Sequence, residues 1–255
     1  RNVLPKPRQL PHPPLWVACS NLNTIEYAAA HGIGALGFQF ASPDGARAWV
    51  NRYYNIISSD KVEKLCEYET NPNLAIVSGF MCAKSDEEAR AKADGWTFFI
   101  FCLQYNSSHT YEPGTVDLWG EYQDWKNTEK AQKAFDSGLI GSPDTIRRKL
   151  REYADANIDQ IILLNQSGKT AHKDICDSLE LFAKEVMPEF HAMEPEHQQW
   201  KAAVMAGEIQ LEDIDVQDHK RLAVTDVIGA GGRRLSQAQL QAKAEQKKAA
   251  AEAAS

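Results

Sequence analysis

Short apolar runs alternate along the chain with longer stretches in which apolar residues recur every three or four positions. The apolar runs predict β-strands at residues 15–19, 35–40, 74–81 and 159–165. The amphipathic stretches predict helices between them, and two of these helices open on a capping residue, Ser85 or Ser142. Strands that alternate with helices favour a parallel sheet with right-handed crossovers, so we expect an α/β fold with four strands.

This alternation is interrupted in two places. Residues 105–141 mix turn residues with aromatic side chains over a length that is too great for an ordinary loop, so we expect an insertion or lid there. The last core helix is expected at residues 172–190, after which the strand signals fade. Residues 191–255 therefore predict a helical or disordered C-terminal extension. A Pro-rich lead-in at residues 1–14 precedes the α/β region, which spans residues 15–190.

The composition is that of a globular protein with an acidic balance. The formal net charge of -7 leaves no basic surface field that could attract nucleic acid or an acidic membrane, so we expect neither as a partner. The longest apolar run, at residues 96–103, is far shorter than the roughly 20 residues that span a bilayer. The five cysteines are scattered and never form a CxxC pair, which predicts reduced thiols in a cytoplasmic protein.

A polar turn follows the first predicted strand, at a place where α/β proteins commonly hold phosphate groups. Ser20, Asn21, Asn23 and Thr24 offer hydroxyl and amide groups beside the N-terminus of a helix, whose free N–H groups attract anions. The alternative is that Asn23 or Thr24 only caps this helix. The last strand ends in a similar polar run at residues 165–168, which opens on the same side of the sheet.

Other polar and aromatic residues suggest chemistry less directly. His109 stands in the predicted insertion, where it either acts as an acid or base on a closing lid or is simply solvated. Trp119, Tyr122 and Trp125 in the same segment either cover a planar ligand or pack against their neighbours. The histidine and glutamate residues at positions 191–197 match no usual zinc spacing, so we expect no metal site.

Three stretches together resemble one known family. The sequence PPLWVACSNLNTIEYAAAHGIGALGF, followed by GSPDTIRRKLREYADANIDQIILL and LELFAKEVMPEF, resembles the C-terminal half of the luciferase-like flavin-dependent monooxygenases. The resemblance covers about residues 3–200. It implies that residues 15–190 form a partial (β/α)8 TIM barrel, with strands five to eight of that barrel and with the mobile lid at residues 105–141. By the same resemblance, the family's first four strands and their active-site His lie outside this chain, which we therefore expect to be a fragment that is inactive by itself.

The resemblance also implies a reaction and a cofactor site. Reduced FMN, often supplied by a separate flavin reductase, would activate O2 for the oxygenation of a small organic substrate. Four residues match family positions around the flavin, and two more stand next to them. Ser20 and Thr24 match positions that hold the flavin phosphate, Cys19 and Asn23 stand beside them, and Phe38 and Gln39 match positions near the isoalloxazine ring.

Two other functions stay open at this point. An enzyme of the same fold could instead transfer hydride with the deazaflavin F420. A chain with four strands could also serve as a non-catalytic binding or scaffold subunit, because it cannot close an eight-stranded barrel alone. For the full-length protein the resemblance further implies a homodimer.

Overall fold

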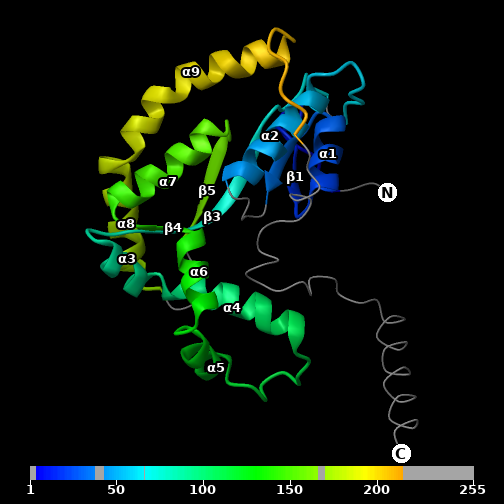
Figure 1. Ribbon diagram of the computed structural model, residues 1–255. Helices are drawn as coiled ribbons and strands as arrows, with labels where there is room; N and C mark the ends of the chain where they lie inside the picture. The colour runs from blue at the N-terminus through cyan, green and yellow to red at the C-terminus, as the bar shows by residue number, and fades with distance from the viewer. Residues whose placement is uncertain (1–3, 38–42, 66, 166–169, 215–255) are drawn as a thin grey trace, which may run out of the picture.

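A parallel β-sheet runs through the centre of the molecule, with helices packed against it (Figure 1). The computed structural model describes residues 4–37, 43–65, 67–165 and 170–214. The strands are β1 (Trp16–Cys19), β2 (Gly34–Gly37), β3 (Leu74–Cys82), β4 (Leu139–Gly141) and β5 (Gln160–Leu164). The helices are α1 (Leu22–Ala30), α2 (Pro43–Ile57), α3 (Asp86–Lys92), α4 (Asp94–Ser108), α5 (Leu118–Trp125), α6 (Glu129–Ser137), α7 (Pro143–Asp155), α8 (His172–Glu185) and α9 (Met187–Met205).

Strand β3 is the longest strand and organises the sheet. Its first half lies between β2 and β5, whereas its last three residues pair with β4. Every pairing is parallel, which confirms the predicted α/β fold with a parallel sheet. In the described residues the sheet has five strands, in the order β1-β2-β3-β4 with β5 paired to β3.

One face of the sheet is covered by helices. Cys19, Gly37, Ile76 and Ile161 are paired in register from β1 to β5, so the side chains of Cys19, Ile76 and Ile161 share this face. Three of them belong to the apolar core that α1 and α2 form with the sheet. Burial of this continuous row of apolar side chains is the main force that joins the helices to the strands.

The opposite face carries two tryptophan rings. Trp16 lies over Gly34 in the neighbouring strand, and a Cβ atom at Gly34 would stand 2.4 Å from that ring. Trp96, from the first turn of α4, lies over Gly79 in the same way. Glycine is required at both positions because the two rings occupy the space where a side chain would begin.

Local signals in the sequence account for several helix ends. The Ser85 hydroxyl accepts a hydrogen bond from the Glu88 amide at 3.1 Å, as the predicted capping box requires. The Ser142 side chain caps α7 in the same manner, with a proline in the first turn. Gly32, just after the C-cap of α1, adopts a φ of 68°, a conformation that glycine reaches without strain.

The expected count of four strands is wrong, because β4 lies in the segment that we expected to be an insertion. That segment, 105–141, contains the end of α4, the helices α5 and α6, and β4. Strand β4 has only three residues, so its apolar pattern is too short to distinguish from a turn. It becomes a strand because Leu139–Gly141 pairs with Phe80, Met81 and Cys82 of β3.

The expected helix at residues 172–190 is in fact two helices, α8 and α9. Pro188 lies in the first turn of α9, where its missing N–H group costs no hydrogen bond, and the chain changes direction at Val186. Helix α9 then continues to Met205, through Pro195, so residue 190 falls within a helix and not at its end.

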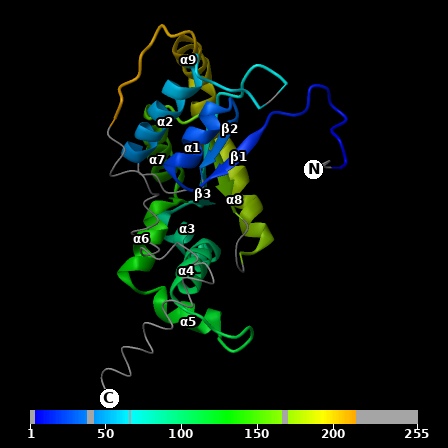
Figure 2. The ribbon, with the colours of Figure 1, turned by 90° about the vertical axis from the view of Figure 1, so that its right-hand side faces the viewer.

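Helices lie at both ends of the sheet. Helix α9 passes the N-terminal ends of β3 and β5, while α4, α5 and α6 lie at the opposite end, where the strands finish (Figures 1 and 2). We call these three helices the α4–α6 lobe. No helix in the described ranges is long and apolar enough to cross a bilayer. The C-terminal ends of the strands therefore face a helical lobe, and their N-terminal ends face α9.

Candidate active site

The turn between β1 and α1 is built around Asn21. Its side-chain Oδ1 accepts a hydrogen bond from the Thr24 amide at 3.1 Å, which makes Asn21 the N-cap of α1. The Thr24 hydroxyl donates to the Asn21 carbonyl at 3.0 Å or to the Asn21 Oδ1 at 3.1 Å. The expectation that Asn23 or Thr24 could be the cap is wrong, because the helix begins two residues earlier than the sequence pattern indicates.

Capping by Asn21 leaves several donors at this turn available to a ligand. The side chains of Ser20 and Asn23 are exposed. Within the described residues, the backbone amides of Leu22 and Asn23 have no hydrogen-bond partner. The first turn of α1 contains no acidic residue, so nothing in it offsets the partial positive charge of the helix end. This arrangement suits an anion such as a phosphate group.

Cys19 is placed differently from the other residues of the turn. Its side chain is fully buried in the core on the helix-covered face, and burial raises the pKa of the thiol to about 11. Cys19 is therefore an uncharged core thiol, and only its backbone lies near the turn. Phe38 and Gln39, the two residues expected near the isoalloxazine ring, lie outside the described residues.

The two polar strand ends are on the same side of the sheet but are not adjacent. Strands β2 and β3 lie between β1 and β5, so the end of β5 is about three strand spacings, or roughly 14 Å, from the end of β1. Asn165 follows β5 and donates from Nδ2 to the Leu163 carbonyl at 3.1 Å, while its buried Oδ1 has no hydrogen-bond partner among the described residues. The rest of the predicted polar run, 166–168, lies outside the described residues.

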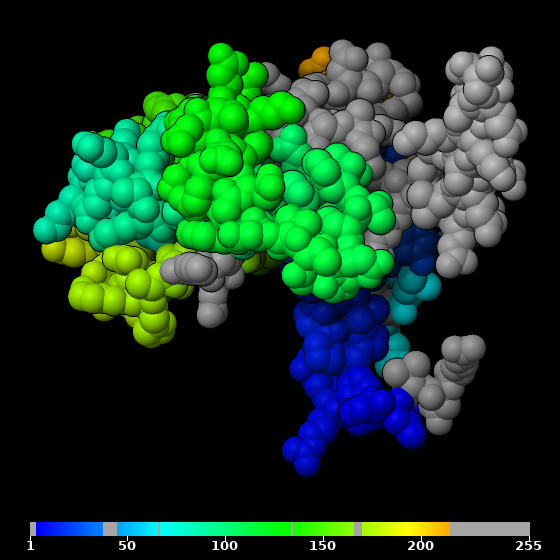
Figure 3. Space-filling model, turned by 90° about the horizontal axis from the view of Figure 1, so that it is seen from below, coloured from blue at the N-terminus to red at the C-terminus, as the bar shows by residue number. Residues whose placement is uncertain are grey.

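The aromatic residues of the α4–α6 lobe form a core of their own. Phe98 lies 5.1 Å from Trp119 and 5.3 Å from Tyr122 between ring centroids, and Phe101 lies 5.5 Å from Trp125. Tyr122 is fully buried and donates to the Asp94 carboxylate at 2.7 Å, and burial raises the pKa of its phenol. These contacts join α4 to α5, as packing residues do. Figure 3 shows the lobe in green from the side on which the strands end.

His109 stands at the C-terminal end of α4, at the margin of the lobe. Its ring stacks on Tyr105 with centroids 4.1 Å apart, and its Nδ1 lies 3.1 Å from the Tyr105 carbonyl oxygen. The residue is exposed, and these local contacts account for its position. Its role as an acid or base on a lid stays a prediction.

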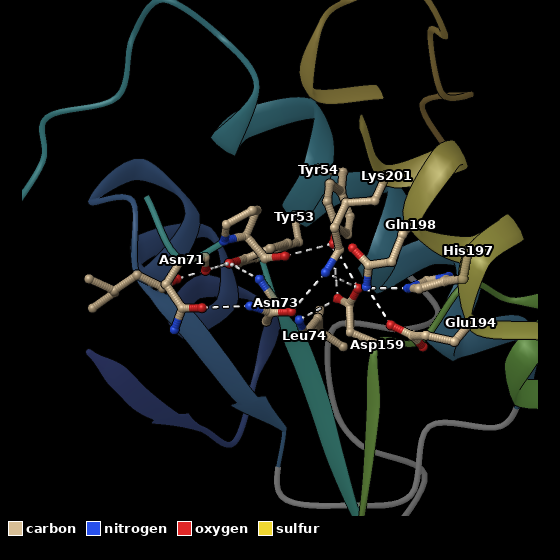
Figure 4. Close-up of polar contacts among 12 residues, drawn as sticks. Tyr53, Tyr54, Asn71, Asn73, Leu74, Asp159, Glu194, His197, Gln198 and Lys201 are labelled. Atoms are coloured by element: carbon tan, nitrogen blue, oxygen red, sulfur yellow. Dashed lines mark hydrogen bonds and ion pairs between the residues drawn. The ribbon is translucent and has the colours of Figure 1, made fainter. Parts of the chain in front are cut away.

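A buried polar cluster lies at the other end of the sheet (Figure 4). Asp159, with only 2% of its side chain exposed, accepts hydrogen bonds from the Tyr54 hydroxyl at 2.9 Å and the Leu74 amide at 2.7 Å. His197 Nε2 and Lys201 Nζ approach the same carboxylate at 2.9 and 2.8 Å. No pattern in the sequence indicates this cluster, since its members come from four distant segments.

This cluster is structural. It lies at the N-terminal ends of β3 and β5, whereas the chemistry of barrel enzymes occurs at the C-terminal ends of the strands. In the described part of the chain, no three His, Cys, Asp or Glu side chains are grouped so that they could hold a metal ion.

A cavity of about 610 Å³ lies beside this cluster, between α7, β5, α8 and α9. Its lining is mostly apolar and includes Leu150, Ile161, Phe182, Phe190, His197 and Trp200. Of the expected cofactor-binding residues that the structure describes, none lines it. The polar turn after β1 therefore remains the better candidate for the active site. It carries exposed hydrogen-bond donors, and it lies at the C-terminal ends of the strands, where α/β enzymes commonly bind their ligands.

The sequence of this chain matches the model of one protein family. A sequence model described as luciferase-like monooxygenase matches residues 1–160. The chain belongs to this family. Members of the luciferase-like family are oxidoreductases, and the expected family is thereby confirmed. A search of curated proteins found no match.

Several solved structures resemble this chain, and RslO1 shows a similar fold. Monooxygenase RslO1 from Streptomyces bottropensis is 19% identical, with a TM-score of 0.51 over 73% of this chain and 51% of that chain. The oxygenating constituent of 3,6-diketocamphane monooxygenase from Pseudomonas putida, in complex with FMN, is 18% identical over 69% and 49% of the two chains, with a TM-score of 0.47. The F420-dependent tetrahydromethanopterin reductase from Methanopyrus kandleri is 18% identical over 69% and 51%, with a TM-score of 0.44. The chain thus spans about half the length of these structures.

Proposed function

We propose that this chain supplies the phosphate-binding part of the flavin site in an FMN-dependent monooxygenase. The observation that carries the proposal is the turn after β1, where the exposed side chains of Ser20 and Asn23 stand at the N-terminus of α1 and the first helical turn contains no carboxylate. The family membership supplies the reaction class. Reduced FMN would supply the electrons that activate O2, and a small organic substrate would be oxygenated.

The donor set at this turn fits a phosphate monoester. The Ser20 residue is exposed and its hydroxyl can donate to a ligand, and the amides of Leu22 and Asn23 belong to the first turn of α1, where an α-helix offers them no acceptor of its own. Hydrogen bonds to an ionised phosphate are roughly twice as strong as those between neutral groups. The helix dipole adds attraction, so the site needs no Lys or Arg side chain from this turn.

Ser20 and Thr24 have different roles in this proposal. The Thr24 hydroxyl hydrogen is directed to Asn21, so this hydroxyl presents lone pairs and not a donor to a bound anion. Thr24 therefore acts by fixing Asn21 and the first turn of α1. Ser20 and the free amides make the direct contacts.

The test is a titration of the protein that carries this chain with FMN and with riboflavin, which lacks the phosphate. Ser20→Ala should weaken FMN binding by about 1–3 kcal/mol and leave riboflavin binding unchanged. Asp60→Ala, which removes an exposed carboxylate in the segment between α2 and β3, is the control. Equal effects of Ser20→Ala on both ligands, or none on FMN, would contradict the site.

The alternative is that the same turn holds the phosphate of F420, the coenzyme named for one of the similar solved structures. Measurements of oxygen consumption distinguish the two possibilities, because an FMN-dependent monooxygenase consumes oxygen when it is supplied with reduced FMN. Activity with reduced F420 alone, without oxygen uptake, would replace the monooxygenase by a hydride-transfer enzyme. A separate flavin reductase as the source of reduced FMN remains part of the monooxygenase proposal.

A further inference from the structure

All walls of the cavity of about 610 Å³ beside Asp159 come from one part of the chain. Its lining residues run from Leu150 to Trp200, in α7, the turn before β5, β5 itself, α8 and α9. The cavity lies where two apolar cores meet. Ile158 and Trp200 pack with the core around α1 and α2, whereas Leu150 and Phe182 belong to the core around α7 and α8. The cavity is therefore a space between packed elements, and its walls include neither end of the chain.

The size and the lining of the cavity are typical of a small-molecule site. Such sites measure about 300–1,000 Å³ and are lined mainly by apolar and aromatic side chains, with a few polar groups that orient the ligand. Phe182, Phe190 and Trp200 provide aromatic surface here, and Leu150 and Ile161 provide aliphatic surface. Transfer of an apolar group from water into this space is favourable. The cavity therefore suits a ligand with a compact aromatic or aliphatic body.

The acidic residues of the lining give the cavity a negative charge. Among the described residues that line it there is no Lys or Arg, and its acidic residues are Asp155, Asp159, Glu194 and Glu196. Lys201 already neutralises Asp159. The other three acidic residues are exposed, and no described Lys or Arg forms an ion pair with them. We call these three residues the mouth of the cavity. The mouth attracts a cation and repels an anion.

We propose that this cavity binds a small organic cation, whose apolar body lies among the aromatic side chains and whose ammonium group lies at the mouth. An ammonium group is also attracted to the face of an aromatic ring, and both Tyr153 and Trp200 line the cavity. A ligand with a carboxylate or phosphate group is disfavoured, because it would meet like charges without a Lys or Arg partner. The sign of the charge at the mouth therefore decides the class of ligand.

This site is separate from the proposed cofactor site. The cavity and the Asp159 cluster that borders it (Figure 4) lie at the N-terminal ends of β3 and β5. The turn that contains Ser20 follows the C-terminal end of β1, and all these strands are parallel. Neither Ser20 nor any residue of the first turn of α1 lines the cavity. The inference goes beyond the proposed function and does not depend on it.

The first test is a fluorescence titration of the full-length protein that carries this chain. The probe is dansylcadaverine, which joins an apolar fluorescent ring system to a primary ammonium group. Its comparator is the dansyl derivative of aminohexanoic acid, which has the same rings and a linker of the same length but ends in a carboxylate. Dansyl emission shifts to the blue in an apolar environment. We expect a saturable blue shift with dansylcadaverine and about ten-fold or more weaker binding of the acid, because the mouth attracts one charge and repels the other.

The second test uses variants of the cavity. Glu194→Gln combined with Glu196→Gln removes two carboxylates of the mouth and should weaken dansylcadaverine binding about two- to ten-fold. Glu180→Gln, at an exposed position of α8 outside the lining, is the matched control and should leave binding unchanged. Ala154→Trp introduces a ring into the cavity from a half-buried position of α7 and should abolish the blue shift.

The proposal would be overturned by the absence of saturable probe binding, which is the result expected if another segment of the protein fills the cavity. Equal binding of the amine and the acid would also overturn it, as would unchanged probe binding in the mouth variant. The mouth variant changes only exposed side chains, so it keeps the test decisive if Ala154→Trp disturbs the fold. Ser20→Ala should leave probe binding unchanged, so the failure of this proposal and that of the cofactor site are distinguishable.

Discussion

Lys201 of α9 donates a hydrogen bond to Asp159, just before β5, with 2.8 Å between Nζ and the carboxylate oxygen. The Asp159 side chain is 2% exposed and that of Lys201 is 11% exposed, so the pair lies inside the protein. Lys201 also donates to Asn73 Oδ1 at 2.7 Å, just before β3. One ammonium group therefore ties α9 to the starting points of two neighbouring strands (Figure 4).

Removal of one partner of this pair should be strongly destabilising. Lys201→Met leaves the Asp159 carboxylate buried without its cation, and such losses cost about 3–5 kcal/mol. We expect urea denaturation to show a lower free energy of unfolding of this size. Lys64→Met breaks an ion pair whose Glu69 side chain is 99% exposed, and it should change stability little. Equal effects of the two variants would show that the buried pair does not hold α9.

The contact between Asp86 and the start of α7 should make stability depend on pH. A hydrogen bond from the Ser142 amide is the main factor that lowers the pKa of Asp86 below 3.8, and Thr145 donates to the same carboxylate at 2.9 Å. A lowered pKa in the folded state means that the stabilisation is present above pH 3.8 and is lost as the pH falls through the folded-state pKa.

Asp86→Asn should therefore destabilise the protein at neutral pH and flatten the decline in stability below pH 3.8. The measurement is a series of urea denaturation curves from neutral to acidic pH. Glu87→Gln removes a carboxylate at the same end of α3 and is the control for the helix dipole. An unchanged acid slope in Asp86→Asn would rule out this contact as its source.

Gly79 should tolerate no side chain while Trp96 is present. A Cβ atom at Gly79 would stand 2.1 Å from the indole ring, so Gly79→Ala must displace Trp96 from the sheet. Overpacking of this kind costs about 1–3 kcal/mol. In a double-mutant cycle with Trp96→Ala, the cost of Gly79→Ala should largely disappear. Additive effects in the cycle would place the strain elsewhere.

Asn21 should matter more for the stability of α1 than either neighbour in the polar turn. Asn21→Ala removes the N-cap and should cost about 0.5–2 kcal/mol in thermal or chemical unfolding. Asn23→Ala, at an exposed position with no capping bond, should change stability by much less. A larger loss of stability in Asn23→Ala than in Asn21→Ala would show that Asn23 is the cap.

The local parts of this fold could be predicted from the sequence. Apolar runs predicted β1, β2, β3 and β5, because burial of a parallel strand leaves a continuous hydrophobic signature in the chain. The caps at Ser85 and Ser142 were also predictable, since donor and acceptor lie within three residues of each other. The start of α1 was misplaced because a polar turn offers several capping residues, and only the backbone geometry selects Asn21.

The candidate site was predictable in part. The sequence by itself determined that a polar turn follows β1 and precedes a helix, because both features depend only on the residues around Ser20. Only the tertiary structure decided that Cys19 turns into the core and that β2 and β3 lie between the end of β1 and the end of β5, because burial and sheet order depend on residues distant in the chain. For the same reason, the short strand β4 exists only through its pairing with β3, and the cluster around Asp159 forms only when four separate segments meet.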